Sequence, residues 1–137
     1  MQIQSYLFFY GRCEEAVRFY EKAIGATDIE LLRFKDAPEQ PPPGAIPPGW
    51  AGKVMHGTFR IGDTVVMVSD AHSEVSPGHN GFALAVTVPT VDDASRVFNA
   101  LAEGGRVTIP IGTTFFSPRF GGVVDKFGVQ WMVLAAA

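Results

Sequence analysis

The heptapeptide EEAVRFY at residues 14–20 has a second copy, DDASRVF, at residues 92–98. Both copies begin with two acidic residues and continue with apolar residues at helical spacing. Acidic residues stabilise the first turn of a helix because they lie near the positive end of its dipole. A second pair of similar segments, VVMV at 65–68 and QWMV at 130–133, follows in the same order. We therefore expect two copies of one supersecondary unit, each burying an apolar face against neighbouring structure.

The two pairs of segments are offset by 78 and 65 residues, so the first copy holds 13 additional residues. This extra chain corresponds to a proline-rich run from Ala37 to Gly49. Proline has no N–H to donate, which excludes it from helix interiors and central strands. We predict a loop or lid here.

Each copy reads β-α-β-β-β, which makes the predicted fold class α+β with mixed sheets. We expect a single domain, with module one at about residues 1–70 and module two at about 81–137. The first module should contain strands at 3–10, 29–34, 54–61 and 64–69 and a helix at 12–24. The second should contain strands at 82–88, 106–111, 121–125 and 129–134 and a helix at 90–102.

Composition excludes several classes of function. The net charge is −3 and the 11 Lys and Arg residues are scattered, which argues against a nucleic-acid partner. No apolar run approaches the roughly 20 residues needed to cross a bilayer, so no membrane partner is expected. One cysteine excludes an internal disulfide framework, and the first residues do not resemble a signal peptide. We expect a cytoplasmic protein.

Three longer motifs carry a family resemblance: SYLFFYGRCEEAVRFYEKAIGA at 5–26, GWAGKVMHGTFRIGDTVVMVSD at 49–70 and TFFSPRFGGVVDKFGVQWMV at 114–133. With them the chain resembles the vicinal oxygen chelate superfamily, which includes glyoxalases, extradiol dioxygenases and bleomycin-resistance proteins. Within it, the chain resembles the PhnB-like branch. The resemblance implies paired βαβββ modules whose curled sheets form a cup with the helices on the outer face. It also implies a homodimer.

Catalytic members of that superfamily hold a divalent metal at four symmetric strand positions. Aligning the motifs places those positions at Ser5, Met67, Ala83 and Met132. Divalent metals of the hard or borderline kind prefer imidazole or carboxylate ligands, whereas thioether sulfur suits Cu(I). We therefore expect no metal and no cofactor at these positions.

Alternate residues of a strand face opposite sides, so parity indicates which residues line the cup. The expected ligand-binding residues on the strands are Ser5, Leu7, Phe9, Met67, Ala83, Ala85, Gln130 and Met132. Two aromatic loop residues at corresponding places, Trp50 and Phe115, are expected to cover the cup as a lid. The alternatives are a filled barrel core or a dimer contact for the strand residues, and an aromatic anchor at the dimer interface for the loop.

Two side chains are candidates for catalysis. His56 is expected on the cup side of its strand, where a neutral imidazole could act as a general base or bind an anion. Arg119 is expected on the cup side with Gly121, where its planar guanidinium suits a carboxylate or phosphonate. A structural histidine and a rim salt bridge are the respective alternatives.

These features favour a metal-free protein that binds a small organic molecule, including anionic ones. The alternative is an enzyme of the lyase, isomerase or dioxygenase type, using an atypical metal or His56 and Arg119 without metal. A noncatalytic scaffold with a packed cup is the third interpretation.

Overall fold

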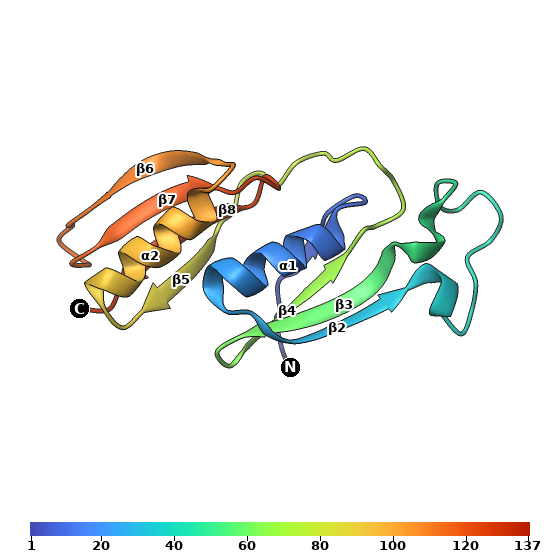
Figure 1. Ribbon diagram of the computed structural model, residues 1–137, viewed down its shortest axis with the longest axis horizontal. Helices are drawn as coiled ribbons and strands as arrows, with labels where there is room; N and C mark the ends of the chain where they lie inside the picture. The colour runs from blue at the N-terminus through green and yellow to red at the C-terminus, as the bar shows by residue number, and fades with distance from the viewer. The chain divides into compact units, whose positions relative to one another are not determined.

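The computed structural model describes all 137 residues and divides into two compact units, Met1–Ser76 and Pro77–Ala137. The first unit contains β1 (Tyr6–Phe8), α1 (Cys13–Ile24), β2 (Thr27–Arg33), β3 (Val54–Ile61) and β4 (Thr64–Ser69) (Figure 1). The second contains β5 (Leu84–Val88), α2 (Val91–Ala102), β6 (Arg106–Gly112), β7 (Phe120–Val124) and β8 (Gln130–Ala135). Each unit thus has the predicted β-α-β-β-β order.

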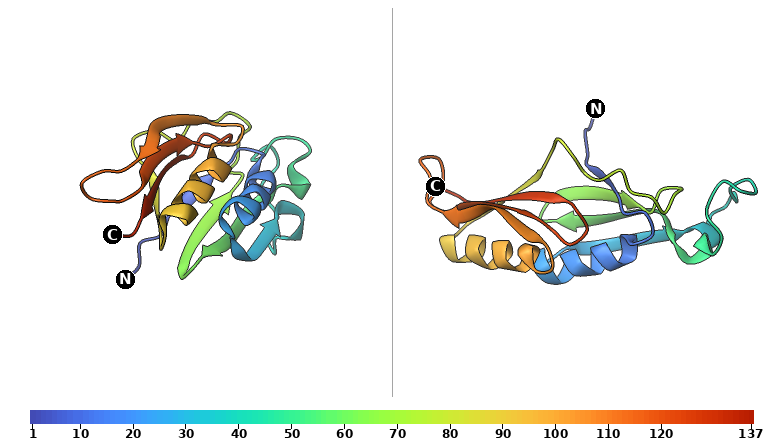
Figure 2. Two further views of the ribbon diagram at one scale, coloured as in Figure 1. Left: turned by 60° about the vertical axis from the view of Figure 1, so that its left-hand side comes forward. Right: turned by 90° about the horizontal axis from the view of Figure 1, so that it is seen from above.

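The two sheets have the same topology. The strand order is β1-β4-β3-β2 in the first unit and β5-β8-β7-β6 in the second. In each, the first strand runs parallel to the last and the other pairs are antiparallel. Each sheet carries its helix on one face only (Figure 2). The predicted α+β class with two βαβββ modules is confirmed.

The helix-facing sides of the sheets form the cores. In the first unit, Val66 and Val68 of β4 and Phe59 of β3 are buried, and Tyr20 of α1 lies 5.8 Å from the Phe59 ring. In the second, the predicted helix face of Ala94, Val97, Phe98 and Leu101 is buried with Trp131 and Val133 of β8. Parity on the final strands is therefore as predicted.

The helix ends follow their sequence signals. α1 is followed by Gly25 with φ of 73°, a left-handed conformation that glycine adopts without strain. At the start of α2, the Thr90 hydroxyl accepts a hydrogen bond from the Asp93 N–H at 3.0 Å. The N-terminus of α1 is capped differently. Oδ1 of the buried Asp70, just after β4, accepts from the N–H groups of Gly11 and Cys13, each at 2.8 Å.

The first strand is shorter than predicted and shifts the repeat by one residue. Tyr10 has φ of 52° and Gly11 of 103°, so the chain turns and β1 ends at Phe8. Met67 pairs with Tyr6, whereas Met132 pairs with Ala85. The offset of the first strands is thus 79 residues rather than the 78 of the helices. The first unit uses one more residue to turn from strand to helix.

The proline-rich run from Ala37 to Gly49 contains no helix or strand, as predicted. Two short 3-10 helices flank it, η1 (Phe34–Asp36) and η2 (Trp50–Gly52). Their aromatic residues meet, since the Phe34 and Trp50 ring centroids are 6.2 Å apart and both side chains are buried. This contact anchors both ends of the loop to the core of its unit.

We expect Cys13 to resist thiol reagents in the native protein. Burial, reinforced by the negative charges of Asp70 and Glu14, raises the pKa of its thiol far above the usual range. Because this pKa is higher in the folded than in the unfolded chain, the stability that Cys13 contributes is complete below about pH 8. It declines as the pH rises above that value. Labelling with a chromogenic disulfide should therefore require unfolding, and rapid labelling of the native protein would contradict this.

Candidate functional site

The first unit has an open sheet face opposite α1, which we call the open face. Its residues alternate with the buried ones along three strands. They are Tyr6 and Phe8 of β1, His56, Thr58 and Arg60 of β3, and Val65 and Met67 of β4. Tyr6 is 38% exposed and Phe8 is 39% exposed. Large aromatic side chains left this accessible on one face are typical of an interaction site.

A hydrogen bond joins the two functional groups on this face. The Tyr6 hydroxyl lies 2.8 Å from Nδ1 of His56, and the two rings are 5.6 Å apart. The bond spans β4, because Tyr6 pairs with Met67, which in turn pairs with Thr58. His56 therefore lies on the sheet face predicted for it. The catalytic or binding role of His56 stays a prediction.

The sequence interpretation missed Tyr6. It stacks on Phe8 with ring centroids 4.9 Å apart and an interplanar angle of 16°. Burial raises the pKa of the Tyr6 phenol above its usual range. The phenol therefore stays protonated at neutral pH and keeps a hydrogen to donate. The available signal was that residues 6 and 8 of one short strand are both aromatic and therefore share a strand face.

The parity prediction for the first strand is wrong. Leu7 and Phe9 are buried on the helix side, where the Phe9 ring lies 6.2 Å from that of Tyr20. Leu7 and Phe9 are thus not on the open face. Ser5 precedes β1 and its carbonyl accepts the Met67 N–H at 3.0 Å, and the ligand role of its side chain stays a prediction. In a run as uniformly apolar as YLFFY, composition does not distinguish one face from the other.

The prediction that Arg119 faces the cup is also wrong. Its Nη1 lies 3.3 Å from the Ser95 hydroxyl of α2, and Gly121 packs against Phe98 of the same helix. Both residues are therefore on the helix side of the second sheet. The two adjacent glycines of β7 carry no side-chain pattern, so parity could not be read from this segment.

The structure places the two loop residues, Trp50 and Phe115, in different environments. Trp50 is buried, 3% exposed, and packs against Phe34 inside its own unit. It has no surface to offer a ligand. Phe115 is fully exposed at the tip of the loop before β7 and meets Phe116 edge-on at 5.2 Å. The ligand role of Phe115 stays a prediction.

On the second sheet, Ala85, Gln130 and Met132 lie on the side away from α2, as predicted. The Gln130 amide donates to the carbonyl of His79 at 2.9 Å, which holds it against the connecting segment. Ala83 is half-buried and precedes β5. No side-chain hydrogen bond like the one between Tyr6 and His56 joins these residues to one another.

The side chains present do not fit the divalent metal of catalytic relatives. The register places Tyr6 beside Met67 and Ala85 beside Met132. Two thioethers and a methyl group are poor ligands for such a metal, and the Tyr6 oxygen is already bonded to His56. No group of three His, Cys, Asp or Glu side chains is placed to hold a metal ion.

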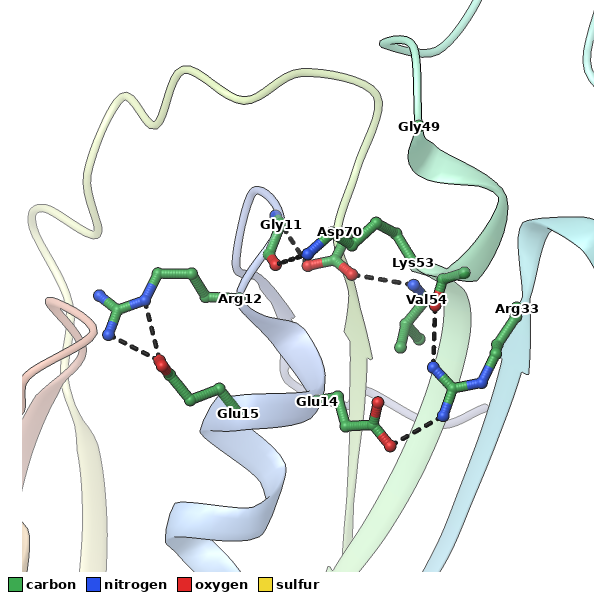
Figure 3. Close-up of a pocket in the computed structure, with 10 residues that line it drawn as sticks. Gly11, Arg12, Glu14, Glu15, Arg33, Gly49, Lys53, Val54 and Asp70 are labelled. Atoms are coloured by element: carbon green, nitrogen blue, oxygen red, sulfur yellow. Dashed lines mark hydrogen bonds and ion pairs between the residues drawn. The ribbon is translucent and has the colours of Figure 1, made fainter.

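A hollow of about 470 Å³ lies at the N-terminus of α1, away from the open face (Figure 3). Its charged groups satisfy one another. Arg33 contacts Glu14 at 2.8 Å and lowers the pKa of that carboxyl, while Arg12 contacts Glu15 at 2.7 Å. The Lys53 ammonium donates to the Gly11 carbonyl at 2.7 Å. We interpret this hollow as a structural junction between helix, loop and sheet rather than a ligand site.

The fold and the open face define a class of protein, and the comparisons identify it. The profile of the Glyoxalase/Bleomycin resistance protein/Dioxygenase superfamily matches residues 2–133, so the chain belongs to this superfamily. Within the superfamily it is PhnB-like. A PhnB protein from Bacillus cereus is 31% identical over 99% of this chain and 100% of that one, with a TM-score of 0.72.

Two further relatives support this assignment. Protein PA1353 from Pseudomonas aeruginosa is 40% identical, with a TM-score of 0.85 over 99% of this chain and 98% of that one. Protein YjdN from Escherichia coli K12 is 32% identical over 97% of this chain and 94% of its own length. No helix of the structure is long and apolar enough to cross a bilayer.

Proposed function

We propose that this protein binds a small organic molecule on the open face of its first sheet, without the divalent metal of its catalytic relatives. The observation that carries the proposal is the Tyr6–His56 hydrogen bond of 2.8 Å on a face with two accessible aromatic rings. Binding sites for small molecules combine apolar surface with a few well-placed polar groups. Here Phe8 and Met67 supply apolar surface, and Tyr6 and His56 supply the polar groups.

The charges beside the pair allow an anionic ligand. Arg60, on the same face of β3, has a single weak ion pair, to Asp28 at 3.9 Å. Glu30 of β2 pairs with Thr58 and adds one negative charge at the outer edge of the sheet.

We also propose that the protein is a homodimer in the cytoplasm. Light scattering after gel filtration tests the dimer.

A screen of small organic molecules by thermal shift tests the binding proposal. A ligand that binds the native state raises the apparent melting temperature. We expect His56→Leu to weaken binding of a stabilising compound by about tenfold, since the polar group that bonds the ligand is lost. Tyr6→Phe should also weaken binding, since the imidazole loses the hydroxyl that orients it. His72→Leu is the matched control because His72 is exposed outside the sheet. The proposal fails if both open-face variants retain the shift of the wild type.

The same pair supports a second candidate, an enzyme that uses His56 as a general base. A phenol 2.8 Å from Nδ1 can orient the imidazole and exchange a proton with it. Arg119 is not part of this arrangement, because its guanidinium bonds to Ser95 of α2. Turnover of a stabilising compound that His56→Gln abolishes would favour the enzyme over the binding protein.

A further inference from the structure

The aromatic side chains of β1 form a row that continues beyond the strand. Tyr6 and Phe8 stack at 4.9 Å, and Phe8 and Tyr10 follow at 6.5 Å with an interplanar angle of 47°. β1 is an edge strand, paired only with β4. Nearly two-fifths of the surface of Tyr6 and of Phe8 is accessible. Such rings offer π-surface to a flat molecule that can stack or meet them edge-on.

The hydrogen bond to Tyr6 involves Nδ1 of His56, so the direction of this bond decides which ring nitrogen carries the hydrogen. A protonated phenol is a strong donor, and the unprotonated nitrogen of a neutral imidazole is a strong acceptor. We therefore assign the Tyr6 O–H as donor and Nδ1 of His56 as acceptor. Neutral imidazole then carries its hydrogen on Nε2. The structure gives Nε2 no protein partner, because the bond to Tyr6 is the one hydrogen bond of the His56 side chain.

The open face thus pairs a row of aromatic rings with an unused N–H donor. We infer that its ligand is a flat aromatic or heteroaromatic molecule carrying a carbonyl or carboxylate. The ring of the ligand packs along Tyr6 and Phe8, and its acceptor oxygen takes the N–H of His56. This inference rests on the proposed function and specifies the class of ligand at the same site. A saturated compound lacks the flat ring, and a purely cationic compound lacks the acceptor oxygen.

Three probes separate these features: benzoate, cyclohexanecarboxylate and benzylamine. Benzoate has both the flat ring and the acceptor, cyclohexanecarboxylate has the acceptor alone, and benzylamine has the flat ring with a cationic donor. Titration followed by NMR measures each dissociation constant and locates the site. We expect benzoate to bind at least about fivefold more tightly than either analogue, the size of an aromatic pair and the lower end for a hydrogen bond to a carboxylate. Its shifts should centre on Tyr6, Phe8 and the Nε2 resonance of His56.

Two variants assign the preference to the named groups. Phe8→Leu keeps apolar volume and removes a ring, so it should abolish the preference for benzoate over cyclohexanecarboxylate. His56→Leu leaves no side-chain donor for the ligand, so it should abolish the preference for benzoate over benzylamine. Circular dichroism confirms that each variant folds, and His72→Leu should retain both preferences.

The outcomes distinguish this inference from the proposed function. If cyclohexanecarboxylate or benzylamine binds the open face as tightly as benzoate, the inferred ligand class is wrong and the binding site stands. The same conclusion follows if benzoate leaves the face unperturbed while other compounds perturb it. If no compound perturbs the open face, the proposed function fails as well.

Discussion

Replacing Asp70 with alanine is expected to lower the free energy of unfolding by about 4 kcal/mol. The carboxylate is 1% exposed and accepts three backbone hydrogen bonds of 2.8 Å, from Gly11, Cys13 and Val54. It joins the turn after β1, the start of α1 and the start of β3. Removing it leaves two buried donors and one part-buried donor without their partner, each of which costs free energy. Denaturant unfolding followed by circular dichroism measures the loss.

Two variants control for this prediction. Asp70→Asn keeps the shape and one acceptor oxygen, so its loss should be smaller than that of Asp70→Ala. Asp63→Ala removes an exposed aspartate whose backbone has no positive φ, and should change stability by less than about 0.5 kcal/mol. If Asp70→Ala unfolds at the same denaturant concentration as Asp63→Ala, the capping role of Asp70 is wrong.

Replacing Gly105 with alanine is expected to destabilise the second unit by about 3 kcal/mol. A Cβ atom there would overlap the carbonyl oxygen of Val124 and approach the Asp125 Cα and carbonyl carbon to 2.9 Å. These are backbone atoms at the end of β7, so no side-chain rotation relieves the clash. The pairing of β6 with β7 would have to shift instead. Amide hydrogen exchange should show the loss of protection concentrated in β6 and β7.

Gly112→Ala is the matched control at the other end of β6. A Cβ atom added at this position would have no other atom within 4 Å, and the backbone of Gly112 has no positive φ. This variant should unfold close to the wild type. Equal stability of the Gly105→Ala and Gly112→Ala variants would show that the approach of the Val124 carbonyl does not constrain residue 105.

Local signals in the sequence were sufficient for most of the secondary structure. The hairpin of β3 and β4 has the predicted bounds because Gly62 and Asp63 interrupt two β-rich segments. α2 follows its capping signal at Thr90, and α1 ends before Gly25. These features depend on neighbouring residues along the chain, which the sequence displays directly.

The candidate site was predictable only in part. The sheet face of His56 could be predicted because apolar and polar residues alternate along β3, and the structure shows the matching alternation of burial. Leu7 and Arg119 were assigned to the wrong face, because YLFFY has no polar residues to mark a side and glycines occupy the relevant part of β7. Trp50 could not be placed, since its burial depends on Phe34 across the proline-rich loop.

The sequence by itself determined the repeated β-α-β-β-β pattern and the poor metal-binding chemistry of Met67 and Met132. Helical spacing, turn residues and ligand chemistry are properties of short segments or single side chains. Tertiary structure decided the face of each first-strand residue, the one-residue shift between the repeats and the meeting of Tyr6 with His56. Those two residues are 50 positions apart and touch across β4. The physical reason is that strand register, which no local pattern specifies here, sets which distant side chains share a face.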